Sequence, residues 1–127
     1  MSQRFTARQR LRSRSQFQRL YDRGIKVHGR YITVFVLPCP EGAPGPGRLG
    51  IAATRRFGGA VERNRAKRRI RELFRTRQEL VAGLDIVVVP KRGFAEASGA
   101  DLERDYLGAL TRAAHKPGPG GRDRAER

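Results

Sequence analysis

The spacing of apolar residues predicts that this chain alternates between helices and strands. Its longest helical pattern covers residues 60–81, where apolar side chains recur every three or four positions and so lie along one side of a helix. These side chains are Ala66, Ile70, Leu73, Phe74, Leu80 and Val81. Arg77 falls on the same side, and we expect it to extend its guanidinium to solvent near the end of the helix.

Two shorter helices are predicted, one before and one after this segment. The first covers residues 16–23, where Ser13 or Ser15 can act as the cap because each is followed three residues later by Gln, and Gly24 can end the helix. Its apolar residues, on one side, are Phe17, Leu20 and Tyr21. The last helix covers residues 100–114, and its buried residues are expected to be Leu102, Tyr106, Leu107 and Leu110.

Three segments rich in β-branched and apolar residues predict strands at residues 31–37, 49–54 and 84–90. One face of the first strand is aliphatic and the other is aromatic and more polar. The aliphatic set is Ile32, Val34 and Val36, and the other set is Tyr31, Thr33 and Phe35. One face of the second strand carries only small side chains, which leaves room for a ligand backbone. The third strand is a short continuous apolar run, as expected for a strand covered on both faces.

The order of these elements predicts how the chain is organised. A strand, a long helix and a buried strand in succession form a βαβ pattern, so the strands containing Leu49 and Ile86 are expected to be parallel neighbours. Residues 38–48, with four prolines and three glycines, are expected to form a hairpin loop. The predicted division is a basic N-terminal arm at residues 1–14, one α/β domain at 15–114 and a disordered tail at 115–127.

The charge of the chain points to a polyanionic partner. There are 28 basic and 12 acidic residues, giving a formal net charge of +16 and a pI near 11.6. The polar side of the 60–81 helix concentrates basic residues at Arg65, Lys67, Arg68, Arg69, Arg71 and Arg75. Such a surface repels itself unless a polyanion neutralises it, and nucleic acid is the first candidate. The alternative is an ordinary solvated basic face on a surface helix.

The single cysteine and the absence of long apolar runs predict a cytoplasmic protein. Because Cys39 is the only cysteine, no disulfide can form within the chain, and a reducing compartment fits. It lies between two prolines and is expected to be an inert loop thiol. The sequence contains neither the ~18 to 20 apolar residues of a membrane span nor an apolar N-terminal signal segment.

The aromatic residues allow two interpretations. Phe17 and Tyr21 on the first helix either belong to the core or line a groove where an unpaired base can stack. Phe35, on the more polar face of its strand, has the same two alternatives. Arg55 and Arg56 follow directly after the second strand.

No catalytic or metal site is predicted in the chain. His28 and His115 are the only histidines and lie far apart in the sequence, so neither a metal cluster nor a nucleophile relay follows. The carboxylates of Asp101 and Asp105 share one side of a helix, where helix-terminus electrostatics accounts for them. Gly58-Gly59 precedes a helix, but no Gly-Lys-Ser/Thr follows, so the segment is not a P-loop.

The central segment resembles a known family. Residues 60–72 read Ala-Val-Glu-Arg-Asn-Arg-Ala-Lys-Arg-Arg-Ile-Arg-Glu, which is similar to the signature of the protein component of bacterial ribonuclease P. The segment 49–58, Leu-Gly-Ile-Ala-Ala-Thr-Arg-Arg-Phe-Gly, resembles the strand that leads into that signature. The spacing of Phe17, Tyr31 and Phe35 fits the N-terminal part of the family, so the resemblance covers roughly residues 8–114.

The resemblance implies a fold and an activity. The implied fold is α+β, an α-β-β-β-α-β-α two-layer sandwich with one mixed sheet and a βαβ crossover that is left-handed in the family, against the usual right-handed rule. The implied role is that of a protein subunit that binds a catalytic RNA and helps it to remove the 5′ leader of precursor tRNA. Magnesium is expected in the RNA subunit, while the protein alone is expected to bind no cofactor or metal, no membrane and no protein partner.

The resemblance also assigns residues to two contacts. Those expected to bind the catalytic RNA are Arg63, Asn64, Arg65, Lys67, Arg68 and Arg71. Those expected to bind the leader are Phe17, Tyr21, Phe35, Thr54, Arg55 and Arg56. The sequence departs from the family where Ala66 replaces a larger aliphatic residue, and where Thr54-Arg55-Arg56 stands in place of the common Ser-Lys-Lys.

Two other functions are compatible with a basic chain of this size. A non-catalytic ribosomal or RNA-assembly protein fits the composition equally well, and the signature at residues 60–72 is what favours ribonuclease P. A DNA-binding regulator would need a second helix next to a recognition helix, whereas here Gly58-Gly59 follows a strand.

Overall fold

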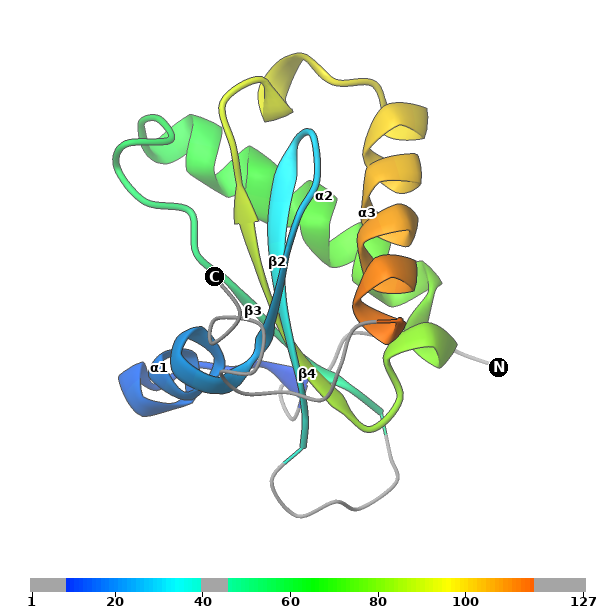
Figure 1. Cartoon of the computed structure of the whole chain (residues 1–127). Helices are drawn as coiled ribbons and strands as arrows, with labels where there is room; N and C mark the ends of the chain where they lie inside the picture. Colours follow the sequence, from blue (N-terminus) through cyan, green and yellow to red (C-terminus); the bar gives the residue numbers. More distant parts are fainter. Residues whose placement is uncertain (1–8, 40–45, 116–127) are drawn as a thin grey trace, which may run out of the picture.

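The computed structural model describes residues 9–39 and 46–115 and places helices on both sides of one sheet (Figure 1). In chain order the elements are α1 (Arg14–Arg23), β1 (Ile25–His28), β2 (Ile32–Pro38), β3 (Arg48–Ile51), α2 (Ala60–Thr76), the 3-10 helix η2 (Gln78–Val81), β4 (Leu84–Pro90), the 3-10 helix η3 (Phe94–Glu96) and α3 (Gly99–Ala114). The α+β class and the α-β-β-β-α-β-α order are confirmed. Residues 1–8 and 116–127, which hold most of the predicted arm and tail, lie outside the described residues.

The sheet is mixed, with strand order β1-β2-β4-β3. Strand β2 is antiparallel to both β1 and β4, and β3 is parallel to β4 with Leu49 opposite Ile86. The predicted parallel pairing of these two strands is therefore confirmed, and α2 is the crossover between them. Strand β4 is central, and its residues from Asp85 to Val88 are buried.

The strands differ from the sequence predictions in three respects. The predicted hairpin between β2 and β3 does not form, because β4 lies between these two strands and pairs with each of them. Strand β1 was not predicted from the pattern, since it has four residues and follows directly after the glycine that ends α1. Strand β3 also ends at Ile51 rather than at residue 54, although the N–H of Ala52 still donates to the Val88 carbonyl at 3.0 Å.

Helices α2 and α3 pack on one face of the sheet and form the larger core. The helix predicted at residues 60–81 ends at Thr76, because Arg77 has non-helical backbone angles (φ −133°, ψ 41°) and its guanidinium pairs with Glu103 of α3. The chain continues as η2, which buries Val81 but leaves Leu80 exposed, contrary to the predicted apolar stripe. The largest fully buried side chains of this core include Phe74, Ile70, Ile86, Phe94 and Tyr106.

Helix α1 covers part of the opposite face, and Figure 1 shows it across the sheet from α3. Its Leu20 packs with Leu11, Leu37 and Val87, while Phe17 and Phe35 lie at the margin of this smaller cluster. Tyr31 was expected to share a face with Phe35 but packs against the α2–α3 core instead. The reason is that β2 begins at Ile32, so Tyr31 belongs to the preceding bend and does not follow the strand alternation.

Asp105 of α3 holds the turn between β1 and β2. Its carboxylate accepts hydrogen bonds from the backbone N–H groups of Arg30, Tyr31 and Ile32, at 2.8, 2.8 and 3.2 Å. Gly29 is required beside it, because a Cβ at that position would lie 2.6 Å from both carboxylate oxygens. A residue that sequence analysis explained by helix electrostatics therefore joins α3 to the edge of the sheet.

We expect Asp105→Ala to lower the free energy of unfolding by about 2–4 kcal/mol, because three backbone donors lose a charged acceptor. Urea denaturation monitored by circular dichroism measures this change. Asp101→Ala is the matched control, since Asp101 is one turn earlier on α3 and its carboxylate pairs with Arg104 of the same helix, so a smaller loss is expected. Equal losses in the two variants would contradict the anchoring role of Asp105.

Candidate nucleic-acid interface

The solvent-facing side of α2 carries more cations than carboxylates, and its exposed acids are Glu62 and Glu72. Its buried side consists of Ala66, Ile70 and Phe74. On the other side Asn64, Arg65 and Arg68 are exposed, and Lys67 and Arg71 are half-buried. Within residues 9–39 and 46–115, no ion pair joins these cations to a carboxylate. We name the five polar residues on this side, 64, 65, 67, 68 and 71, the α2 basic face.

Two arginines of the same helix point elsewhere. Arg63, expected to bind the catalytic RNA, donates from Nη1 to the Gly58 carbonyl at 2.9 Å and so holds the turn that leads into α2. Arg69, expected beside the outward arginines, donates from Nη2 to the Ala97 carbonyl at 2.8 Å and stacks over the Phe94 ring at 5.5 Å. Arg69 therefore joins α2 to the segment before α3, and it is not part of the α2 basic face.

An aromatic cluster joins α1 to β2. The ring centroids of Phe17 and Tyr21 are 6.3 Å apart, and those of Tyr21 and Phe35 are 5.0 Å apart in an edge-to-face arrangement. Lys26 Nζ lies 5.6 Å from the centroid of the Phe35 ring. Tyr21 keeps 38% of its surface exposed, so a ring of this cluster is accessible from solvent. The structure thus brings together the three aromatic residues expected to bind the leader.

The small residues of β3 do not all leave room for a ligand. A Cβ on Gly50 would lie 2.7 Å from Cζ of Phe17, so the space above this glycine is filled by the ring of Phe17. The next small residue on that face, Ala52, is half-buried. Its N–H donates a hydrogen bond to the carbonyl of Val88 in the central strand β4. The expectation of an open strip over β3 is therefore wrong at Gly50, where the close approach of α1 requires glycine.

Thr54, Arg55 and Arg56 lie on the exposed turn between β3 and α2. The N–H of Phe57 donates to the Thr54 carbonyl at 3.0 Å and closes the turn. In the described part of the chain, no hydrogen bond or ion pair connects these three side chains to the aromatic cluster. The guanidinium groups of Arg55 and Arg56 are therefore exposed to solvent between β3 and α2.

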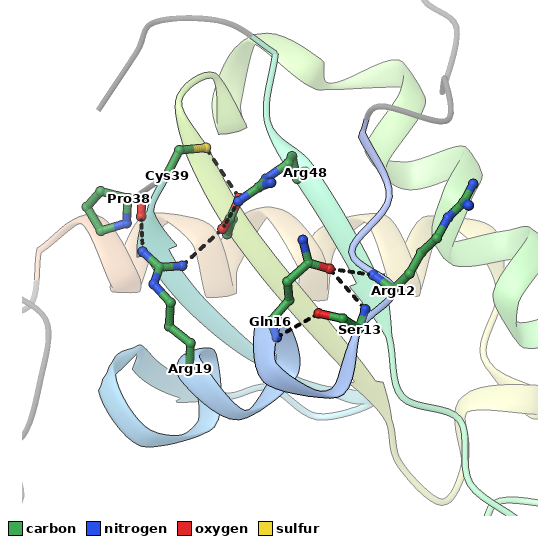
Figure 2. Close-up of polar contacts among 8 residues, drawn as sticks. Arg12, Ser13, Gln16, Arg19, Pro38, Cys39 and Arg48 are labelled. Atoms are coloured by element: carbon green, nitrogen blue, oxygen red, sulfur yellow. Dashed lines mark hydrogen bonds and ion pairs between the residues drawn. The ribbon is translucent and has the colours of Figure 1, made fainter. Parts of the chain in front are cut away.

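A buried carboxylate positions α1 on the sheet (Figure 2). Asp85, with 1% of its side chain exposed, accepts from Arg48 at 2.8 Å and from Arg19 of α1 at 3.1 Å. Arg19 also donates to the Pro38 carbonyl at 2.8 Å. Removing one member of a buried ion pair typically costs about 3–5 kcal/mol. This contact could not be predicted from the sequence, because Asp85 lies within an apolar run and its partners are 37 and 66 residues away.

Cys39 lies beside the same carboxylate, and its thiol donates to Asp85 at 3.3 Å. Burial and then the hydrogen bond to Asp85 raise the pKa of this thiol to about 11. The thiol is therefore protonated at neutral pH, which fits the inert role expected for it.

The start of α1 is set by a capping box (Figure 2). Ser13 Oγ accepts from the N–H of Gln16 at 3.2 Å, and Gln16 Oε1 accepts from the N–H of Ser13 at 3.0 Å and of Arg12 at 2.8 Å. Of the two serines that could cap this helix, the structure uses Ser13. Because the cap fixes the first turn, it also fixes where Phe17 meets the sheet.

Arg10 and Arg12 were predicted only as part of the basic N-terminal arm at residues 1–14, with no assigned contact. Both line a cavity of about 180 Å³ that also reaches Lys67 and Arg71 of α2. The alternation of arginine at residues 8, 10, 12 and 14 is the signal that could have indicated an extended, one-sided basic segment.

The described residues contain no group of three or more His, Cys, Asp or Glu side chains placed to hold a metal ion. Across the same residues, no helix is both long and apolar enough to cross a membrane.

Comparison with known proteins identifies relatives over most of the chain. The family model described as ribonuclease P matches residues 5–114. The ribonuclease P protein component of Desulfovibrio desulfuricans is 42% identical over 114 residues, which cover 86% of each chain. That of Acidothermus cellulolyticus is 38% identical over 116 residues, covering 88% of this chain and 96% of the relative.

Solved structures agree with this result. The ribonuclease P protein of Staphylococcus aureus superposes with a TM-score of 0.73 at 28% identity, covering 83% of this chain and 94% of that one. The protein from Thermotoga maritima gives a TM-score of 0.71 at 31% identity, covering 81% and 96%. The arrangement of helices and strands is therefore shared with proteins of known structure.

Proposed function

The chain belongs to the ribonuclease P protein family, and from this premise we propose that it binds the catalytic RNA of ribonuclease P and the 5′ leader of precursor tRNA. The observation that carries the proposal is the α2 basic face, whose Arg65, Lys67 and Arg68 have no carboxylate partner in the described part of the chain. A surface of this kind is stabilised by a polyanion, and a large folded RNA supplies many phosphates at once. Asn64 and Arg71 extend the same contact. Arg63 stabilises the start of α2 through its hydrogen bond to the Gly58 carbonyl.

The aromatic cluster supports a separate contact with the leader. A single-stranded leader exposes its bases, and stacking on aromatic rings tolerates any base sequence. Tyr21 and Phe35 offer the rings, with Phe17 behind them, while Thr54, Arg55 and Arg56 lie on the turn that follows β3. Because mature tRNA has no leader, this contact would favour binding of the precursor over the product.

Catalysis is assigned to the RNA subunit, with magnesium ions bound there. The protein's contribution is to hold the substrate and to reduce the repulsion between two polyanions, which lowers the magnesium concentration that the RNA needs. A chain with one cysteine is suited to a reducing compartment, and we place the complex in the cytoplasm.

A ribosomal or RNA-assembly protein is the alternative function, and one experiment separates the two. We expect the purified protein to restore cleavage of precursor tRNA by ribonuclease P RNA at magnesium concentrations where the RNA alone is inactive. The released leader and mature tRNA are measured on a denaturing gel. No restoration, together with retained binding to other structured RNA, would favour the alternative.

The triple variant Arg65→Ala, Lys67→Ala, Arg68→Ala should bind ribonuclease P RNA more weakly and with a salt dependence reduced by about 2 to 3 in the slope of log K against log salt. The slope is measured by filter binding across a range of potassium chloride concentrations.

The matched control removes three exposed cations elsewhere, at Arg23, Arg92 and Arg104. The slope of log K against log salt for this control should be close to that of the unmodified protein. If the two variants change the slope equally, the α2 basic face is not the contact with the RNA.

Tyr21→Ala should weaken binding of leader-bearing tRNA to the holoenzyme by about 5- to 100-fold and leave mature tRNA binding unchanged, because one stacked base is lost. Both dissociation constants are measured with the same RNA subunit. Tyr31→Ala is the control, since Tyr31 packs on the opposite side of the sheet and should not alter the ratio of the two constants. An equal loss for both RNAs with Tyr21→Ala would remove the aromatic cluster from the leader contact.

A further inference from the structure

A small basic cavity lies where the segment before α1, strand β3 and helix α2 meet. Its volume is about 180 Å³, which is room for a phosphate group. Arg10 and Arg12 line it from the N-terminal segment, and Lys67 and Arg71 line it from α2. The ring of Phe17 also contributes to its wall.

The two N-terminal arginines are held in place by their backbone. Arg10 forms a parallel bridge with Leu49, and the N–H of Leu11 donates to the Leu49 carbonyl at 2.9 Å. Leu11 is 5% exposed and packs under α1, and the N–H of Arg12 is bound by Gln16 at 2.8 Å. Figure 2 shows the Arg12 side chain pointing away from Arg19 and Arg48. The backbone of both residues is therefore fixed before any ligand arrives, which keeps their two exposed side chains near the cavity and lowers part of the entropy cost of binding.

Among the described residues, every charged side chain that lines this cavity is a cation. The pKa of Arg71 is lowered, first by loss of solvent and then by repulsion from Arg10 and Arg68. Cations held together in a partly desolvated site oppose folding, and an anion bound between them removes that cost.

We propose that this cavity holds one phosphodiester group of an RNA chain, bound by Arg10 and Arg12 together with Lys67 and Arg71. The proposal rests on the RNA-binding function above and adds Arg10 and Arg12 to it. Arginine suits the role because its planar N–H donors match the oxygens of a phosphate.

The position of the cavity allows two sources for the phosphate. Phe17 is shared with the aromatic cluster, so a leader that stacks on Tyr21 could continue into the cavity. Lys67 and Arg71 belong to the α2 basic face, so a strand of the catalytic RNA could reach it as well. In both cases the group recognised is a phosphodiester, and the cavity joins the two RNA-binding surfaces.

Phosphate ethylation interference tests the proposal and identifies the source. Precursor tRNA or ribonuclease P RNA is ethylated at random phosphates, which removes charge, and the molecules still bound in the holoenzyme are mapped. With the unmodified protein, ethylation of the phosphate in the cavity should exclude that RNA from the complex. With Arg10→Ala, Arg12→Ala this one position should no longer interfere, and affinity for the same RNA should fall about tenfold or more.

Two further variants make the result specific. Arg14→Ala, Arg23→Ala removes two exposed cations of α1 outside the cavity and should retain every interference position. The double variant Arg10→Gln, Arg12→Gln removes both charges but keeps part of the side-chain length. If the same interference position is lost in the alanine and in the glutamine double variant, the cause is the loss of charge and not the loss of packing.

Each outcome decides the question. If the variant at Arg10 and Arg12 loses an interference position, the proposed phosphate site is supported. The RNA that contains this position, the leader or the catalytic RNA, is then the ligand. An interference pattern that is the same with and without Arg10 and Arg12 overturns the cavity but leaves the proposed function intact. An unmodified protein that shows no interference on either RNA overturns both.

Discussion

Strand β4 is the element on which the rest of this structure depends, because it is covered on both faces and paired along both edges. It is antiparallel to β2 and parallel to β3, and α2 connects β3 to it. Ile86 and Val88 face α2 and α3, while Val87 faces α1. At its start, the buried Asp85 binds Arg19 and Arg48. The elements proposed to contact RNA are α1, β2 and α2. Each of them packs on β4, pairs with it, or packs on a strand that pairs with it.

The distribution of acids explains how so basic a chain can fold and still present an open cationic surface. The carboxylates of Asp85 and Asp105 are used inside the fold, where they bind long-range partners and fix α1 and the β1–β2 turn. Glu72 and Glu103 pair with Arg75 and Arg77 at the C-terminal end of α2. Residues 60–71 of α2 hold one acid, Glu62, and six cations, so the folded chain keeps much of its self-repulsion until a polyanion binds.

The pattern of apolar and polar residues predicted the fold better than it predicted the contacts of the candidate RNA-binding residues. The helical spacing of Ala66, Ile70 and Phe74 and the parallel pairing of Leu49 with Ile86 could be predicted, because both follow from periodicity and βαβ order. The strand order could not, since a proline-rich loop is compatible with a hairpin or with an inserted strand. The roles of Arg69 and Asp105 also stayed hidden, because their partners lie on other elements and sequence spacing does not identify such partners.

The pairing of residues 10 and 11 with β3 has a consequence for the protein before it meets RNA. An uncovered outer strand offers unpaired N–H and C=O groups to another chain, which is a route to aggregation. Here the segment before α1 occupies that side of β3 at Leu49, and it carries Arg10 and Arg12, whose charge repels a second copy. At the other end of the sheet, β1 has only four residues. The segment that is proposed to hold a phosphate therefore also covers part of the outer edge of the sheet.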